Sequence, residues 1–172
     1  MPRCLCSLSP RLDLTVGHPH DVCTVMVLCS NNTITVSLAL TVSFKATDVA
    51  TITISGLASA AGPAASTIPV QHVSGQNVLG SSAAWSKSAG TLQLIVSSDW
   101  SRGTVSVFAF TLVNPASEQS AASLSIAANW GGTYSIAFAA MDSDTVNATA
   151  QTATVAGDAA PLKVYNPTFI LR

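Results

Sequence analysis

Short segments in which apolar residues alternate with hydroxyl-bearing ones run through most of this chain, and they restrict it to β structure. In residues 35–45 the even positions are apolar and most odd positions are Thr or Ser, which is the two-residue period of a strand with one buried face. Similar segments continue to residue 169, separated by Gly, Pro, Asn or Ser, and no helical periodicity interrupts them. Each such strand must bury its apolar face against a second layer.

This arrangement predicts an all-β fold of about seven to nine strands, a two-sheet antiparallel sandwich that is immunoglobulin-like in general architecture. A closed barrel or a jelly roll is the alternative. Residues 105–113 are apolar on both faces, which is typical of a central strand that is covered on both sides. Pro63 and Pro69 cannot donate to a central ladder and place their segment at an edge.

Two further segments are predicted to bury alternate residues in the same way. Residues 51–55 would point Ile52 and Ile54 inward, and residues 133–139 would form a strand whose apolar set is Tyr134, Ile136 and Phe138. The opening strand would bury the apolar even positions of residues 35–45, ending with Val42 and Phe44.

The size and charge of the chain narrow the function classes. With 172 residues, we expect one β-sandwich module in residues 22–172, preceded by an irregular N-terminal extension in residues 1–21. Only 9% of the residues are charged, against about 25% in an average soluble domain, and the formal net charge is −1. Nothing supplies the positive field of a nucleic-acid-binding protein, and no apolar run is long enough for a transmembrane helix.

All the cysteines lie near the N-terminus, so no disulfide can link strands of the main body. Together with two histidines they suggest zinc ligands, but their spacing fits no standard finger, and local disulfides or unpaired thiols are the simpler expectation. The residues concerned are Cys4, Cys6, Cys23, Cys29, His18 and His20.

Three passages carry a resemblance to a known kind of protein: TITISGL, the passage from SAAW to GTLQLIV, and FTLVNP. Over roughly residues 29–169 the chain resembles one copy of a module found in very large, repetitive, uncharacterised proteins of unicellular algae and related protists. The resemblance implies a tandem module of a secreted or cell-surface protein, with neighbouring modules or matrix proteins as partners and no established activity. The chain departs from that pattern in showing a single copy and an unusual N-terminal segment.

The residues give little support to catalysis, and we expect no enzyme and no catalytic residues. His72 is the one histidine of the predicted module, and no nucleophile elbow of the G-x-S-x-G type is present. Asp142 and Asp144 are too close together to act as the separate acid and nucleophile of a glycosidase. They are instead candidate calcium ligands, with an ordinary charged turn as the alternative.

The alternative to a structural module is a binding module for carbohydrate. Trp85, Trp100 and Trp130 all lie beside turn residues, where aromatic rings could stack on sugars or could cap the ends of the core with their N–H groups bonded to loops. Threonine-rich faces also resemble ice-binding surfaces, but those need several aligned rungs, and a hydrated exterior is the simpler expectation. Asn31 and Asn147 begin glycosylation acceptor triplets, which matter if the chain is secreted.

Overall fold

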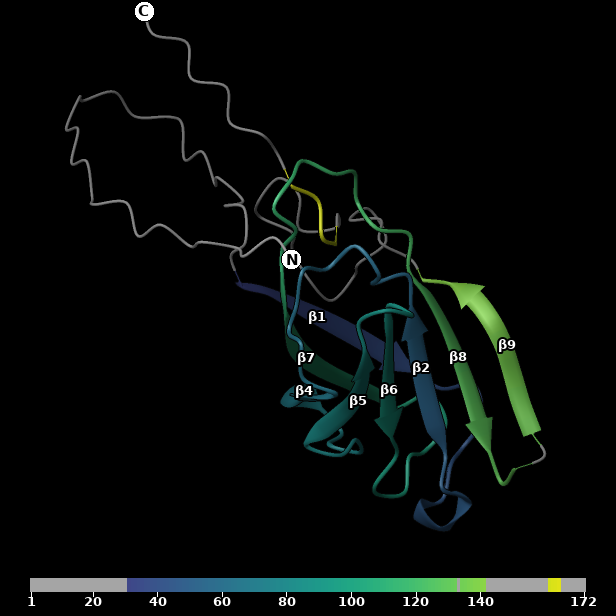
Figure 1. Ribbon diagram of the computed structural model, residues 1–172. Coiled ribbons are helices and arrows are strands. Elements are labelled where there is room, and N and C mark those ends of the chain that lie inside the picture. Colours follow the sequence, from purple (N-terminus) through teal and green to yellow (C-terminus); the bar gives the residue numbers. More distant parts are fainter. Residues whose placement is uncertain (1–30, 133, 142–160, 165–172) are drawn as a thin grey trace, which may run out of the picture.

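Two antiparallel β-sheets packed face to face form the part of the chain described by the computed structural model, namely residues 31–132, 134–141 and 161–164 (Figure 1). The smaller sheet has three strands in the order β1-β7-β4, and the larger has six in the order β3-β5-β6-β2-β8-β9. The predicted two-sheet sandwich is therefore confirmed. None of the helical structure in these residues has the length and hydropathy that crossing a membrane requires.

The elements are short, and most coincide with predicted segments, whereas the strands at residues 71–75 and 82–86 were not predicted. Their bounds are β1 (Asn31–Ala39), the 3-10 turn η1 (Ala46–Asp48), β2 (Thr51–Ser55), β3 (Thr67–Pro69), β4 (Gln71–Gly75), β5 (Ser82–Ser86), β6 (Thr91–Ile95), β7 (Val105–Val113), β8 (Ser125–Trp130) and β9 (Tyr134–Ala140). The predicted strands after residue 141 lie outside the described residues, apart from a bridge between Gln119 and Val164.

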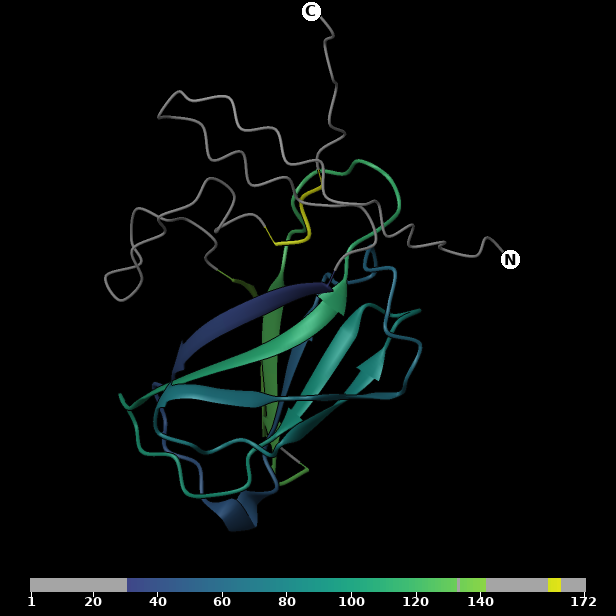
Figure 2. The same cartoon turned by 90° about the vertical axis from the view of Figure 1, so that its left-hand side faces the viewer.

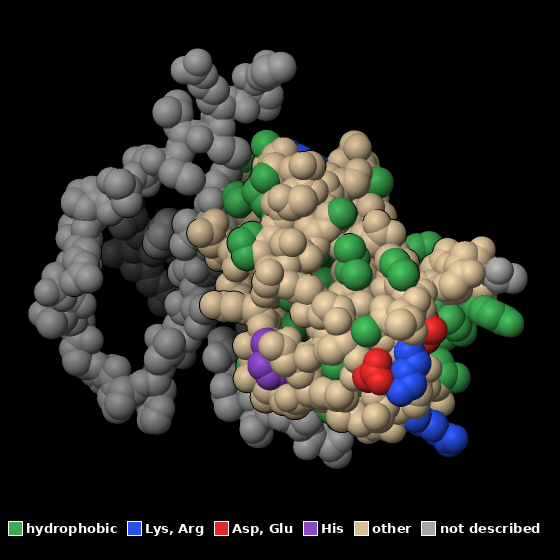
Figure 3. All heavy atoms as spheres, turned by 90° about the horizontal axis from the view of Figure 1, so that it is seen from below, with side chains coloured by type: hydrophobic (Ala, Val, Ile, Leu, Met, Phe, Trp, Pro, Cys, Tyr) green, Lys and Arg blue, Asp and Glu red, His purple; other side chains and the backbone are tan. Residues whose placement is uncertain are grey.

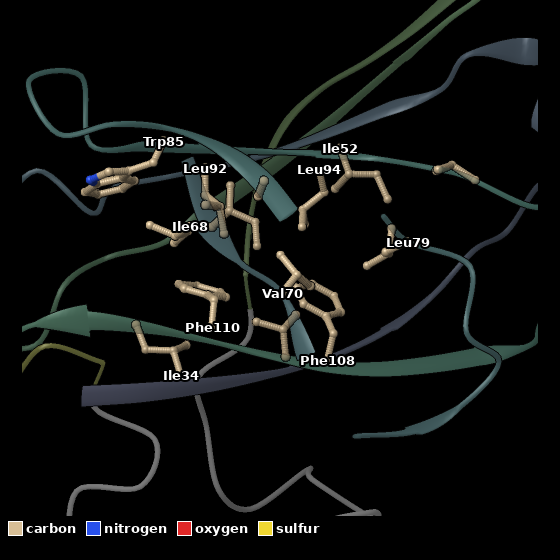
Figure 4. Close-up of a cluster of buried hydrophobic side chains, with 14 of the residues drawn as sticks. Ile34, Ile52, Ile68, Val70, Leu79, Trp85, Leu92, Leu94, Phe108 and Phe110 are labelled. Atoms are coloured by element: carbon tan, nitrogen blue, oxygen red, sulfur yellow. The ribbon is translucent and has the colours of Figure 1, made fainter. Parts of the chain in front are cut away.

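The core lies between the two sheets, and alternate residues of each strand fill it. From the smaller sheet, Ile34, Phe108 and Phe110 point toward the larger one, where Ile52, Leu92 and Leu94 face them (Figure 4). All six are buried, and burying a side chain of this size contributes about 1.5–3 kcal/mol. Viewed from the side, the strands of the smaller sheet cross those of the larger at an angle (Figure 2).

The opening strand is shorter than its pattern predicts. β1 ends at Ala39, and Val42, which alternation would bury, is 40% exposed. The chain leaves the smaller sheet there to reach β2 in the larger one, so the two-residue period no longer applies. Phe44 is buried nevertheless, because its backbone exchanges two 2.9 Å hydrogen bonds with that of Trp100 in the loop between β6 and β7.

The strand predicted to be central, β7, does lie in the middle of its sheet, between β1 and β4. Its inner residues are buried, but cover on the outer face is incomplete, since Val105 is 41% exposed. The segment with Pro63 and Pro69 likewise occupies an edge, because β3 is the first strand of the larger sheet.

The larger sheet extends beyond the smaller one on the side of β8 and β9. Figure 1 shows β1 and β7 passing behind the middle of the larger sheet, with β9 at its outer margin. All seven residues of β9 are exposed, whereas β2 and β6 each alternate between buried and more exposed positions. A three-stranded layer is thus too narrow to cover a six-stranded one.

Gly90 provides a test of how tightly the hairpin between β5 and β6 packs on the segment after β2. It has φ of +62°, and a Cβ there would collide with the backbone of Ala58, while its carbonyl accepts the amide of Leu57 at 3.0 Å. Gly90→Ala should destabilise the fold by at least about 2 kcal/mol in urea denaturation, because strain and collision add. Gly103→Ala is the matched control: its φ is +75° but nothing lies near its Cβ, so only the backbone strain, about 1 kcal/mol, should be lost. Equal effects would refute the packing argument.

Candidate interaction surface

An aromatic row leads from the core to the surface at the end of the hairpin formed by β8 and β9. The ring of buried Phe44 lies 5.1 Å from that of half-buried Trp130, and Trp130 stacks on Tyr134 at 5.9 Å with an interplanar angle of 21°. Such offset aromatic pairs contribute about 0.5–1.5 kcal/mol beyond the area they bury. The row therefore favours one position of the Tyr134 ring, although that side chain is 63% exposed.

The register places these side chains on the inner face of the larger sheet. Ile52 of β2 lies opposite Ala128 of β8, which in turn lies opposite Ile136 of β9, and Trp130 lies opposite Tyr134. Ile136 and Tyr134 therefore continue the face that forms the core. We call β9 together with Trp130 the overhang, since the smaller sheet leaves this part of the larger sheet uncovered. Tyr134 and Ile136 lie on its inner face, whereas a register irregularity after Ile136 places Ala139, not Phe138, opposite Ile126.

The exposed apolar side chains of the overhang are large. Tyr134, Ile136 and Phe138 are exposed by 63%, 42% and 57% of their surface. The expectation that the core buries them is therefore wrong. The physical reason is the strand order: β9 is the last strand of the larger sheet, and no described strand lies beyond it or opposite it.

The overhang carries no charge. No Lys, Arg, Asp or Glu occurs in the sequence between Glu118 and Asp142. Figure 3 shows basic and acidic side chains close together at the lower end of the sandwich, with hydrophobic ones at the right-hand rim, the side of the β8–β9 hairpin. Among the described residues, Lys45 and Asp99 form an ion pair in which the Lys45 Nζ lies 2.7 Å from an oxygen of Asp99.

That ion pair shifts both groups in the direction expected for opposite charges. The hydrogen bond from Lys45 lowers the pKa of the Asp99 carboxyl, assisted by the backbone amide of Ala46, and the same bond raises the pKa of Lys45. Both side chains are largely exposed, so the pair adds little to stability. Its role is to connect the start of η1 to the β6–β7 loop. The carbonyl of Asp48 in η1 accepts a 3.0 Å hydrogen bond from Gly131, so these charges lie near the turn end of the overhang.

Two of the three tryptophans proposed to stack on sugars lie in the core. Trp85 is 4% exposed and donates its Nε1–H to the carbonyl of Pro63 at 2.9 Å, and Trp100 is fully buried and donates to the carbonyl of Thr104 at 2.9 Å. Their rings are not available to a ligand. Trp130 is half-buried, so a platform with two solvent-facing tryptophan rings does not form among the described residues.

An open depression lies over the edge of Trp85, with a volume of about 610 Å³. Its wall is mostly small side chains from three segments, with one charged residue, Lys87. The lining residues are Ala58, Ala64, Ala65, Ser66, Trp85, Ser86, Lys87 and Ser88. His72 lies elsewhere, exposed on β4 opposite Phe108.

The threonines of neighbouring strands do not form regular rows across the sheets. Thr33 lies opposite Thr111, with their hydroxyls 3.0 Å apart, but Thr35 lies opposite Ala109. On the larger sheet Thr51 lies between Ile95 and Asn129. The outer faces are therefore mixed polar surfaces rather than the aligned arrays that ordering water would require.

The other predicted site residues are only partly covered by the structure. Asn31 is exposed at the start of β1, and the hydroxyl of Thr33 in its acceptor triplet faces that of Thr111. Asp142, Asp144 and Asn147 lie outside the described residues, so the calcium proposal and the second glycosylation triplet have no structural account. In the part of the chain that the structure describes, no group of three or more His, Cys, Asp and Glu side chains is placed to hold a metal ion.

Comparisons with known proteins identify no relative. The chain matches no family model, no curated protein and no solved structure.

Substitutions of aromatic residues test which rings are structural. Trp100→Ala should lower the free energy of unfolding by about 3–5 kcal/mol, because it removes a fully buried ring and leaves the Thr104 carbonyl without its donor. Tyr134→Ala, which truncates an exposed ring, should cost less than about 1.5 kcal/mol. Urea denaturation followed by circular dichroism measures both, and a Trp100→Ala protein as stable as Tyr134→Ala would show that Trp100 is not part of the core.

Proposed function

We propose that the protein is a non-enzymatic structural and adhesive β-sandwich module of a secreted or cell-surface protein, and that it makes its contacts through the overhang. The observation that carries the proposal is the exposure of Tyr134, Ile136 and Phe138 on an uncharged edge strand. Monomeric soluble proteins rarely leave a contiguous group of large apolar side chains in water unless it meets a partner.

The rest of the surface supports a module that is otherwise passive. Hydroxyl and amide side chains supply most of its polarity, and charged residues are only 9% of the chain. Such a surface is well hydrated but attracts ligands only weakly through charge. Recognition is then concentrated at the overhang, which the aromatic row connects to the core.

A small adhesive surface is effective when it is repeated. A single overhang offers fewer contacts than a stable interface needs. In a tandem protein, however, the first contact would raise the effective concentration of the neighbouring overhangs near their partners. Neighbouring modules and matrix proteins are therefore the partners we propose. This is consistent with the resemblance of the sequence to a tandem-repeat module.

Carbohydrate binding is the second candidate, because Trp130 and Tyr134 present a stacked aromatic pair at the surface. Sugars stack on such rings in many binding modules, and Tyr134 also offers a hydroxyl group. A glycan array probed with the wild-type chain and with Tyr134→Ala separates the two functions. Glycan binding that disappears in Tyr134→Ala would favour the carbohydrate module.

Adhesion can be measured with beads coated densely with the full chain. Coated beads should attach to surfaces bearing extracellular-matrix proteins, or to one another, roughly tenfold more than beads carrying a Tyr134→Ser, Phe138→Ser double variant, because the double variant removes the apolar contact. Counting attached beads under flow gives the ratio directly.

Val73→Ser is the matched control for the bead experiment, since Val73 is 54% exposed on β4, an edge strand of the other sheet. Beads carrying this variant should adhere like wild type. Wild-type beads that adhere no better than uncoated ones would refute the adhesive function, and equal loss in Val73→Ser would place the adhesive surface elsewhere.

A further inference from the structure

The exposed edges of the sandwich differ in how well they are protected against pairing. β3 is three residues long and ends in a proline, and the pairing of β4 with β7 has an irregularity between His72 and Ser74. β1 is longer, but apart from Ala39 its exposed side chains are hydroxyls and amides. β9 combines seven residues with exposed apolar side chains and has no proline, glycine or charge, although its pairing with β8 also shifts register, between Ile126 and Ala128.

The composition of the overhang also allows two identical copies of it to meet without repulsion between like charges. In a symmetric contact between two identical copies the same surface meets itself, so any charge would face its own kind near the two-fold axis. The absence of Lys, Arg, Asp and Glu from residues 119–141 removes that repulsion. Aromatic and branched aliphatic side chains, by contrast, pack well against one another across strands.

The inner face of the overhang specifies what kind of surface could cover it. Ile136 and Tyr134 continue the core face, so the layer that covers them must be an apolar sheet surface like the one that covers Ile52. The inner face of a second overhang is such a surface. Two copies that stack these faces would complete, for each other, the layer that the smaller sheet does not supply.

The area available sets the strength of this contact. At the exposures observed, Tyr134 and Ile136 of the inner face present on the order of 250 Å² per copy. Two copies with their adjoining backbone would then bury roughly 800 Å², below the standard size of a stable interface. The contact is therefore expected to be weak and reversible between single modules.

We propose that the overhang is a homotypic docking surface, on which the overhang of a second copy packs face to face about a two-fold axis near Ile136. This inference rests on the proposed function, since it names the partner of the same adhesive surface. In a tandem protein the contact would join modules of neighbouring chains and would gain strength by repetition.

The experiment measures self-association of the full chain by analytical ultracentrifugation over a wide concentration range. Wild type should dimerise reversibly, and Ile136→Lys and Ile136→Glu should each weaken dimerisation at least tenfold, because each brings like charges together near the axis. An equimolar mixture of the two variants should recover association, since the opposite charges then face each other. Recovery in the mixture is the result that a nonspecific loss of hydrophobicity would not give.

Ile95→Lys is the matched control, because Ile95 is 52% exposed on the outer face of the same sheet. It should dimerise like wild type. If Ile136→Lys fails to fold by circular dichroism, the pair Tyr134→Lys and Tyr134→Glu, at a 63% exposed position of the same face, repeats the test.

Three results would overturn the inference: a wild-type chain that stays monomeric at all concentrations, dimerisation that Ile136→Lys leaves unchanged, or a mixture that fails to associate. The bead experiment distinguishes failure of the homotypic contact from failure of the proposed adhesive function. Beads that adhere to matrix proteins while the chain stays monomeric would leave the adhesive function standing and remove only the homotypic partner. If the chain dimerises but coated beads adhere to nothing, the homotypic contact would stand and the adhesive function would be refuted.

Discussion

Hydrophobic packing between two sheets of unequal width is the constraint on which the rest of this structure depends. The smaller sheet, with β7 at its centre, covers the residues of β2 and β6 that point inward. It does not reach β9, where Tyr134 and Ile136 continue the core face with no described strand opposite them. The alternation of apolar residues that builds the core thus produces an exposed apolar surface where the smaller sheet no longer covers the larger one.

The aromatic row connects that surface to the core. Phe44 is held in the core by its backbone pairing with Trp100, Trp130 packs on Phe44, and Tyr134 stacks on Trp130. Each aromatic pair favours one arrangement of its rings by about 0.5–1.5 kcal/mol, so the orientation of Tyr134 is biased before any partner arrives. Preorganisation of this kind lowers the entropy cost of binding, which matters for a contact of small area.

The strands could be predicted from the sequence because alternation is a local property. Ile52, Ile54, Leu92 and Leu94 occupy the inward positions that their two-residue period assigns to them. The strand order is not local, and the sequence from Tyr134 to Phe138 alternates just as a core strand does. Only the position of β9 at the end of the larger sheet turns its apolar face into a surface.

The candidate site was harder to predict for the same reason. The turn tryptophans drew attention because large aromatic residues at loops often bind sugars, yet Trp85 and Trp100 are buried by segments distant in sequence, including Pro63 and Phe44. One signal was available in the sequence: the uncharged stretch between Glu118 and Asp142, the part of the chain that forms β8 and β9. Its meaning depends on exposure, which periodicity alone does not give.

Amide hydrogen exchange of β9, measured by mass spectrometry on dilute and concentrated samples of the wild-type chain, tests the central claim most directly. The account predicts that peptides covering Tyr134–Ala140 exchange rapidly in dilute solution and become protected at high concentration, while peptides of the β3 and β4 edges do not change. Strong protection of β9 at high dilution would mean that a single chain already covers the overhang. That result would contradict the account, as would rapid exchange at every concentration.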